Sequence, residues 1–196
     1  GHSFGGLLTL YVAAHAPGRV ERALVLDVPA EVDPAVLDQI GPSLARLDQV
    51  YPSRRAYLDF VRALPYFAGD GWDDGVAAFY EAEIEELPDG TVRPRCRPAH
   101  IRLAVEGTFG PDWAGVAAAV DCPTLLLRTT DPFGLPGSGP IMSADGAART
   151  LARLRRGQLV EVPGNHITFA FGRRAGRAVD ELLSFAGAAD TIRLSS

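Results

Sequence analysis

The chain opens on a serine set between glycines, in the run GHSFGG over residues 1–6. This run matches G-x-S-x-G, in which the serine sits on a tight turn between a strand and a helix and exposes its hydroxyl as a nucleophile. Side chains at Gly1 and Gly5 would obstruct the close approach of the two elements. The backbone N–H of Phe4 would then face the place where an oxyanion forms. The alternative is a glycine-rich helix start in which Ser3 only caps the helix.

The rest of the chain supplies the elements that such a turn requires. The apolar run over 7–16 predicts a helix directly after it. Three further apolar runs, over 21–29, 123–128 and 158–162, predict buried parallel strands, and 143–154 predicts a helix between the last two. This order of elements indicates the C-terminal portion of an α/β protein with a mostly parallel sheet.

On these residues the chain resembles the α/β-hydrolase superfamily. The shared features are GHSFGG at the turn, an aspartate in the loop after PTLLLR, and the sequence VPGNH near the end, in the chain order Ser, Asp, His. The resemblance covers residues 1 to about 30 and about 120 to 187. It implies a catalytic triad of Ser3, Asp131 and His166, with the Phe4 N–H as one oxyanion donor and the second donor in a segment upstream of Gly1.

Four histidines compete for the role of the base. His2 neighbours Ser3 and is expected to point elsewhere on the turn, His15 falls in the last turn of the first helix, where it complements the helix dipole, and His100 lies in the insertion. His166 follows a strand in a glycine-containing loop, where a base can reach a serine at the strand ends. Asn165, which precedes His166, is expected to supply a turn conformation.

Two aspartates compete for the role of the acid. Asp131 follows the strand before the histidine-bearing unit, and there it could fix the imidazole tautomer. Asp27 is the alternative, because it also ends a predicted strand. Asp131 begins a long segment, over 131–139, that is rich in Gly and Pro. The alternative for Asp131 is therefore a structural role in a turn. Asp145 lies in the first turn of a predicted helix, where its favourable interaction with the helix dipole explains an acidic residue.

About ninety residues separate the first two predicted strands, which is far more than an ordinary connection. We expect a core over 1–30 and 118–196, and a mainly helical cap over 31–117 that covers the site. Helices are predicted over 34–47, 53–64, 73–86 and 99–109. The aromatic residues of the insertion suggest an apolar pocket for an acyl or aromatic group, or else they form the core of the cap. They include Tyr51, Tyr57, Phe60, Tyr66, Phe67, Trp72, Phe79 and Tyr80.

Arg93, Arg95 and Arg97 occupy every second position of their segment, which indicates that they lie on one face of a short strand. We expect this face to be solvated rather than anion-binding.

Composition narrows the function classes. The 196 residues contain 19 basic and 24 acidic side chains, a net charge of −5 that argues against nucleic acid or anionic membrane as partners. All the basic residues are arginine, so chemistry that needs a P-loop or Schiff-base lysine is excluded. Cys96 and Cys122 have no metal or disulfide spacing, and we expect free thiols. No apolar run approaches the roughly 18 residues of a membrane span, and we expect a cytoplasmic protein.

The resemblance implies a serine hydrolase that cleaves a carboxylic ester of a small to medium apolar molecule through an acyl-enzyme on Ser3, without metal or organic cofactor. Thioesterase, acyltransferase and carbon–carbon hydrolase activities use the same turn, and a noncatalytic binding domain is the alternative of another class. Because the chain starts inside the motif, we interpret it as a fragment. Alone, it is expected to expose a sheet edge, aggregate and have little activity.

Overall fold

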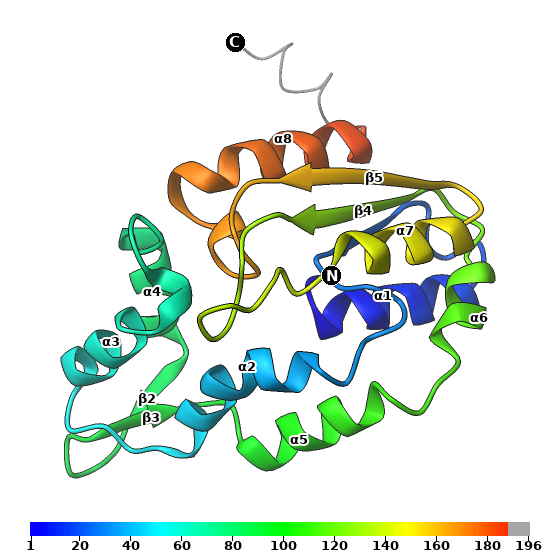
Figure 1. The fold of residues 1–196 in the computed structure, drawn as a ribbon. Coiled ribbons are helices and arrows are strands. Elements are labelled where there is room, and N and C mark those ends of the chain that lie inside the picture. Colours follow the sequence, from blue (N-terminus) through cyan, green and yellow to red (C-terminus); the bar gives the residue numbers. More distant parts are fainter. Residues whose placement is uncertain (188–196) are drawn as a thin grey trace.

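The computed structural model describes residues 1–187 and places a parallel three-stranded sheet at its centre, in the order β1-β4-β5 (Figure 1). The strands are β1 (Ala23–Leu26), β4 (Thr124–Thr129) and β5 (Gly157–Val162). Leu24 pairs with Leu125, and Leu126 with Leu159. On the free side of β1, His2 forms a parallel bridge with Leu26, and the Ser3 N–H donates to the Leu26 carbonyl over 2.9 Å. Residues 1–3 therefore extend the sheet beyond β1.

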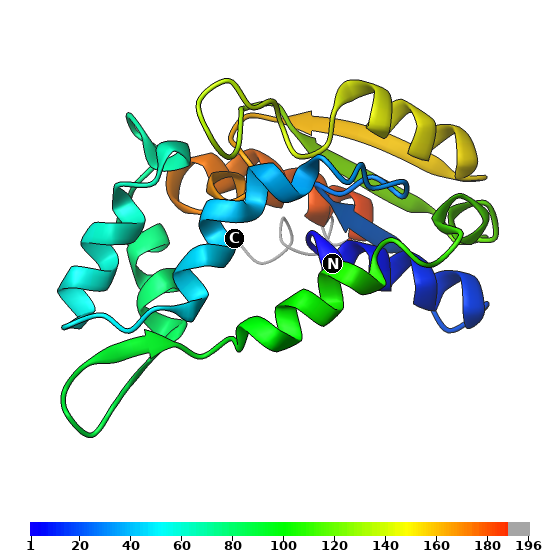
Figure 2. The same ribbon diagram turned by 60° about the horizontal axis from the view of Figure 1, so that its bottom comes forward.

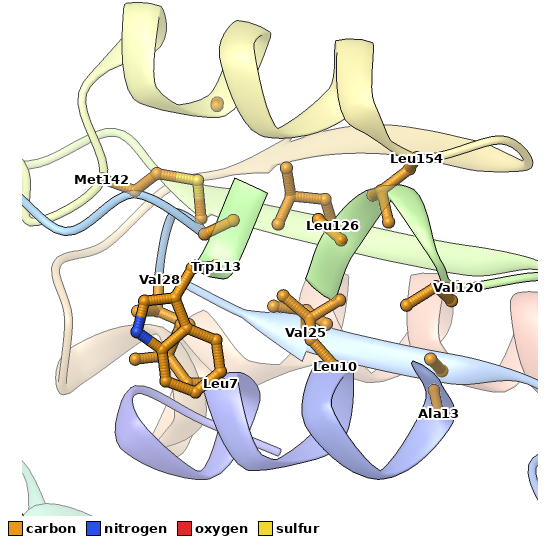
Figure 3. Packing of buried hydrophobic residues seen from close by; sticks show 14 residues of the cluster. Leu7, Leu10, Ala13, Val25, Val28, Trp113, Val120, Leu126, Met142 and Leu154 are labelled. Atoms are coloured by element: carbon orange, nitrogen blue, oxygen red, sulfur yellow. The ribbon is translucent and has the colours of Figure 1, made fainter. Parts of the chain in front are cut away.

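Helices cover both faces of this sheet. Helices α1 (Phe4–His15), α6 (Trp113–Ala118) and α7 (Ala144–Arg153) pack on one face, where Leu7, Val25 and Leu126 share a core with residues of all three helices (Figure 3). Helix α8 (Ala175–Ala186) covers the other face, against Leu127 and Val162. Successive residues of a strand point to opposite faces, so an unbroken apolar run is what a sheet covered on both sides requires. The predicted α/β architecture with a parallel sheet is confirmed.

The insertion between β1 and β4 lies beyond the carboxyl ends of the strands (Figure 1). It has its own apolar core, which includes Tyr57, Phe67 and Tyr80. Its elements are α2 (Val36–Ala45), η1 (Arg46–Asp48), α3 (Arg54–Arg62), η2 (Pro65–Phe67), α4 (Asp74–Ala82), β2 (Ile84–Glu86), β3 (Val92–Pro94) and α5 (Pro98–Gly107).

One predicted helix of the insertion is too long. The helix expected over 73–86 ends at Ala82, and Ile84–Glu86 forms β2, which pairs antiparallel with β3. The hairpin between them is closed because the Leu87 N–H donates to the Thr91 carbonyl and Asp89 accepts from the Thr91 N–H. Pairing with β3 and burial of Ile84 outweigh the helical pattern of this segment.

The arginines of this hairpin are paired within the protein. Glu85 accepts from Nε of Arg93 over 2.8 Å and from Nη2 of Arg97 over 2.9 Å, and Arg95 donates to the Ile84 carbonyl. These contacts support the interpretation of a solvated, ion-paired face.

The predicted border between core and cap, at residues 117 and 118, falls inside α6. Trp113 and Ala117 of that helix are buried in the same cluster as Leu7 of α1, so α6 packs with the core. Residues 188–196, the end of the predicted core range, lie outside the described residues.

Candidate active site

Ser3 occupies a backbone conformation that few residues other than glycine adopt, with φ 55° and ψ −127°. It is held there because its N–H donates to Leu26 and its carbonyl accepts from the Gly6 N–H over 2.7 Å. Strain of this kind persists only where the surroundings impose it, and it is frequent at active sites. Within the described residues, the Ser3 side chain makes no capping hydrogen bond. The interpretation of Ser3 as a mere helix cap is therefore wrong.

The glycines that this turn requires are Gly1 and Gly6. A Cβ on Gly1 would collide with the Gly5 carbonyl, and one on Gly6 would lie 2.7 Å from Cγ1 of Val28. A Cβ on Gly5 would meet no described atom within 4 Å. The expectation that a side chain at Gly5 would obstruct the turn is thus wrong for the described residues, among which a Cβ at this position has open space.

His166 and Asp27 form a buried pair. Nδ1 of His166 lies 2.8 Å from Oδ2 of Asp27, and the two residues are 6% and 0% exposed. The same carboxylate accepts from the Thr129 N–H over 2.9 Å and from the Thr129 hydroxyl over 2.8 Å. An ionised carboxylate only accepts, so Nδ1 carries the proton in this pair. In the neutral imidazole, Nε2 of His166 then keeps its lone pair, as a general base requires.

The structure thus pairs His166 with Asp27, and the prediction that Asp131 orients this imidazole is corrected. Among residues 1–187, no hydrogen bond joins Asp131 to His166. The Asp131 N–H donates to the Gly164 carbonyl, which keeps this loop beside the continuation of β5. Its side chain is 45% exposed and lies 3.6 Å from Nη1 of Arg174. Asp27, which directly follows β1 and has φ 52°, instead has a fully buried carboxylate in contact with His166.

His2 was expected to point away from the site, but it packs against the candidate base. The ring centres of His2 and His166 are 4.4 Å apart, and Phe169 lies against His2 on another side. Nε2 of His2 is buried and has no partner among the described residues. Burial lowers the pKa of His2 to about 4, and the positive charge that His166 acquires on protonation acts in the same direction. His2 is therefore a neutral ring at neutral pH.

The other candidate residues take no part in the His166–Asp27 pair. Nδ1 of His15 donates to the Tyr11 carbonyl in the last turn of α1, and His100 is exposed in α5. The unusual turn conformation before His166 belongs to Gly164, with φ 106°, rather than to Asn165. Asn165 is buried, accepts from the N–H groups of residues 167 and 168, and donates to the Tyr66 carbonyl over 2.7 Å. It thereby ties the histidine loop to the insertion.

A cavity of about 800 Å³ opens between the core and the insertion. Ser3, Phe4 and His166 line it on the core side, and α2, α4 and α5 line it on the other. Within residues 1–187, the Phe4 N–H has no backbone acceptor, as expected at the first turn of a helix. Of the aromatic residues expected in a pocket, Phe79 and Tyr80 line this cavity, while Tyr51, Tyr57, Tyr66 and Phe67 form the core of the insertion.

Several further features bear on function. In residues 1–187, no three His, Cys, Asp or Glu side chains are grouped as metal ligands, and both cysteines are free thiols. None of the helices in this part of the chain has the length and apolar character that a membrane crossing requires.

Comparison with solved structures identifies the fold. The chain is similar to E-2-(acetamidomethylene)succinate hydrolase, with a TM-score of 0.75 and 20% identity over 96% of this chain and 65% of that one. It is also similar to an α/β hydrolase from Novosphingobium aromaticivorans, with a TM-score of 0.68 and 22% identity over 94% and 64% of the two chains. An enol-lactonase from Burkholderia xenovorans gives a TM-score of 0.63 and 17% identity over 95% and 64%.

The chain therefore has the α/β-hydrolase fold, as the sequence predicted, and it spans less than two thirds of the length of each of these neighbours. No protein-family model and no curated protein matches it. At identities of 22% or less, the similarity establishes the fold, while the chemistry has to be argued from the site itself.

Proposed function

We propose that this chain carries the nucleophile, base and acid of a serine hydrolase that cleaves a carboxylic ester, or a related acyl compound, of a small to medium apolar molecule. The observation that carries the proposal is the strained Ser3, whose side chain caps no helix within the described residues and which lines the same cavity as His166, the partner of the buried Asp27. Hydrolases, esterases and an enol-lactonase among the structural neighbours support this class of reaction.

In the proposed mechanism, Nε2 of His166 takes the proton of the Ser3 hydroxyl as the oxygen attacks the carbonyl carbon. Asp27 holds the imidazole in the required tautomer and stabilises its protonated form. The Phe4 N–H donates to the oxyanion of the tetrahedral intermediate. Collapse expels the alcohol, which receives the proton from His166, and a water deprotonated by His166 then releases the acid from Ser3.

The apolar lining of the cavity supports an apolar substrate and the assignment of the insertion as a cap. Leu7 and Val28 of the core line the cavity, Phe133 joins them from the apolar cluster of the insertion, and Leu37 and Ile40 line it from α2. Pockets of this kind bind the apolar body of a ligand and use a few polar groups to orient it. A thioester substrate would fit the same site, and a thioesterase domain is among the structural neighbours. The cytoplasmic location stays a prediction.

The test uses the natural protein that contains this chain, with Ser3→Ala compared against Ser138→Ala, because both serines line the cavity. A fluorophosphonate probe should label wild type and Ser138→Ala but leave Ser3→Ala unlabelled. Turnover of p-nitrophenyl acyl esters should fall by about 10⁴-fold or more in Ser3→Ala alone. A protein that no probe labels and that cleaves no ester would contradict the proposed function and favour the noncatalytic alternative.

A further inference from the structure

The cavity extends along the whole of α2. Its lining includes Val36 and Leu37 in the first turn of that helix, Ser43 and Leu44 in the last, and Arg46 just beyond. A helix rises about 1.5 Å per residue, so these positions span roughly 15 Å. In Figure 2, α2 runs from the sheet to the far part of the insertion. The cavity therefore has a reactive end at Ser3 and a distal end at η1 and α4.

Apolar side chains dominate the wall between these two ends, although Asp38 and Gln39 of α2 also line the cavity. Leu37 and Ile40 of α2 and Ile101, Ala104 and Val105 of α5 line it. Within the described chain, no residue of either helix is buried, although both helices carry these apolar side chains. Helices of this kind normally bury their apolar stripe against another element. Here the stripes face the cavity, so the middle part of a ligand has to be apolar.

The distal end is polar. Nη1 of Arg46 lies 2.7 Å from Oε1 of Glu83, and these side chains are 9% and 19% exposed. The Arg46 guanidinium also lies 5.1 Å from the centre of the Tyr80 ring. Nearby, the Ser43 hydroxyl is 2.8 Å from the hydroxyl of Tyr66. A serine hydroxyl can donate once and accept twice, so Ser43 keeps hydrogen-bonding capacity for a ligand after this bond.

We propose that this distal end is a subsite for an uncharged hydrogen-bonding group, such as a hydroxyl, at the far end of an apolar acyl chain whose carbonyl lies at Ser3. The proposal rests on the proposed function. The charges of Arg46 and Glu83 cancel, so the subsite carries no net charge to compensate a buried carboxylate or ammonium. An unsubstituted alkyl end would desolvate the Ser43 hydroxyl without replacing its hydrogen bonds to water.

The experiment compares p-nitrophenyl octanoate with the ω-hydroxyoctanoate ester, the ω-aminooctanoate ester and the monoester of octanedioic acid, on the natural protein. The expected kcat/KM for the ω-hydroxy ester exceeds that for the unsubstituted ester by about five- to tenfold. The two charged tails should be the poorest substrates. Ser43→Ala should bring the ratio of ω-hydroxy to unsubstituted ester close to one, whereas Ser138→Ala, at another part of the wall, should leave the ratio unchanged.

Cleavage of the unsubstituted ester with a ratio near one in wild type would overturn the subsite and leave the proposed function intact, as would a preference for either charged tail. If no ester is cleaved, the proposed function fails, and calorimetric titration of octanoate and ω-hydroxyoctanoate tests the subsite separately. Tighter binding of the hydroxy acid to wild type, lost in Ser43→Ala, would support the subsite. Equal binding would contradict it.

Discussion

Nδ1 of His166 lies 2.8 Å from Oδ2 of Asp27, on a carboxylate with no exposure to solvent. The two residues are separated by most of the chain and meet because β1 and β5 flank the same central strand, β4. Thr129, at the end of β4, completes the arrangement with two hydrogen bonds to Asp27. The pair and its support thus come from the residue after β1, the last residue of β4 and the loop that follows β5.

Replacing Thr129 by valine should weaken this support. The change removes the hydroxyl that donates to Asp27 but keeps the shape of the side chain and its N–H. A hydrogen bond to a charged group stabilises by about 1.5–3 kcal/mol, so the free energy of unfolding at pH 7 should fall by roughly that amount. Urea denaturation measures it. Thr129→Ser retains the hydroxyl and serves as the control; an equal loss in both variants would assign the effect to packing instead.

His2→Phe should reduce the loss in the free energy of unfolding that occurs as the pH falls. The unfolded chain protonates His2 below its ordinary pKa of 6.5, whereas burial delays protonation in the folded state to about pH 4. The unfolded state therefore binds more protons between these values, and wild type loses stability as the pH falls. At pH 5 this contribution is roughly 1–2 kcal/mol. Phenylalanine removes it.

The measurement for His2 is the free energy of unfolding of wild type and His2→Phe at pH 7.5 and pH 5. The variant should lose less stability than wild type over this interval. His166 and Asp27, the two side chains that act electrostatically on His2, are present in both proteins. Parallel losses in the two proteins would show that His2 is already protonated, or is solvated, in the folded state.

Gly6→Ala and Gly5→Ala should differ sharply although the positions are adjacent. The Cβ at position 6 would lie 2.7 Å from Val28 and 3.2 Å from the Gly1 carbonyl, so alanine should cost about 1–3 kcal/mol of folding stability. At position 5 the Cβ meets no described atom within 4 Å, and alanine in a helix should stabilise by up to about 1 kcal/mol. Thermal unfolding distinguishes the two. Destabilisation by Gly5→Ala would contradict the described elbow.

The sequence predicted the fold well because its signals are local. An apolar run such as that over 123–128 indicates a strand buried on both faces, and the order of the elements then predicts a parallel sheet. Ser3 and His166 can be proposed as site residues from the sequence, because a glycine-bounded turn and a loop after a strand are visible in the residues themselves. The segment over 84–86 was mistaken for helix because its partner strand, β3, decides its conformation.

The aspartate that pairs with His166 is harder to predict, because both Asp27 and Asp131 follow strands and only three-dimensional contacts distinguish them. No sequence pattern indicates the positive φ of Asp27 or the two hydrogen bonds that it accepts from Thr129. The contact of His2 with His166 was missed for the same reason, since it depends on how the loop after β5 folds back over the turn at Ser3. Gly164, the glycine before Asn165, was the available signal for that loop.

The assignment of the acid is tested most directly by comparing Asp27→Asn with Asp131→Asn in the natural protein that contains this chain. The two variants make the same chemical change, and circular dichroism verifies that both are folded. Asp27→Asn should lower kcat for p-nitrophenyl ester hydrolysis by on the order of 10³–10⁴-fold, because the amide no longer holds the imidazole in the basic tautomer. Asp131→Asn should stay within about twofold of wild type, since its carboxylate is half exposed and lies against Arg174. A large loss in Asp131→Asn with a folded, active Asp27→Asn would contradict the Ser3–His166–Asp27 site.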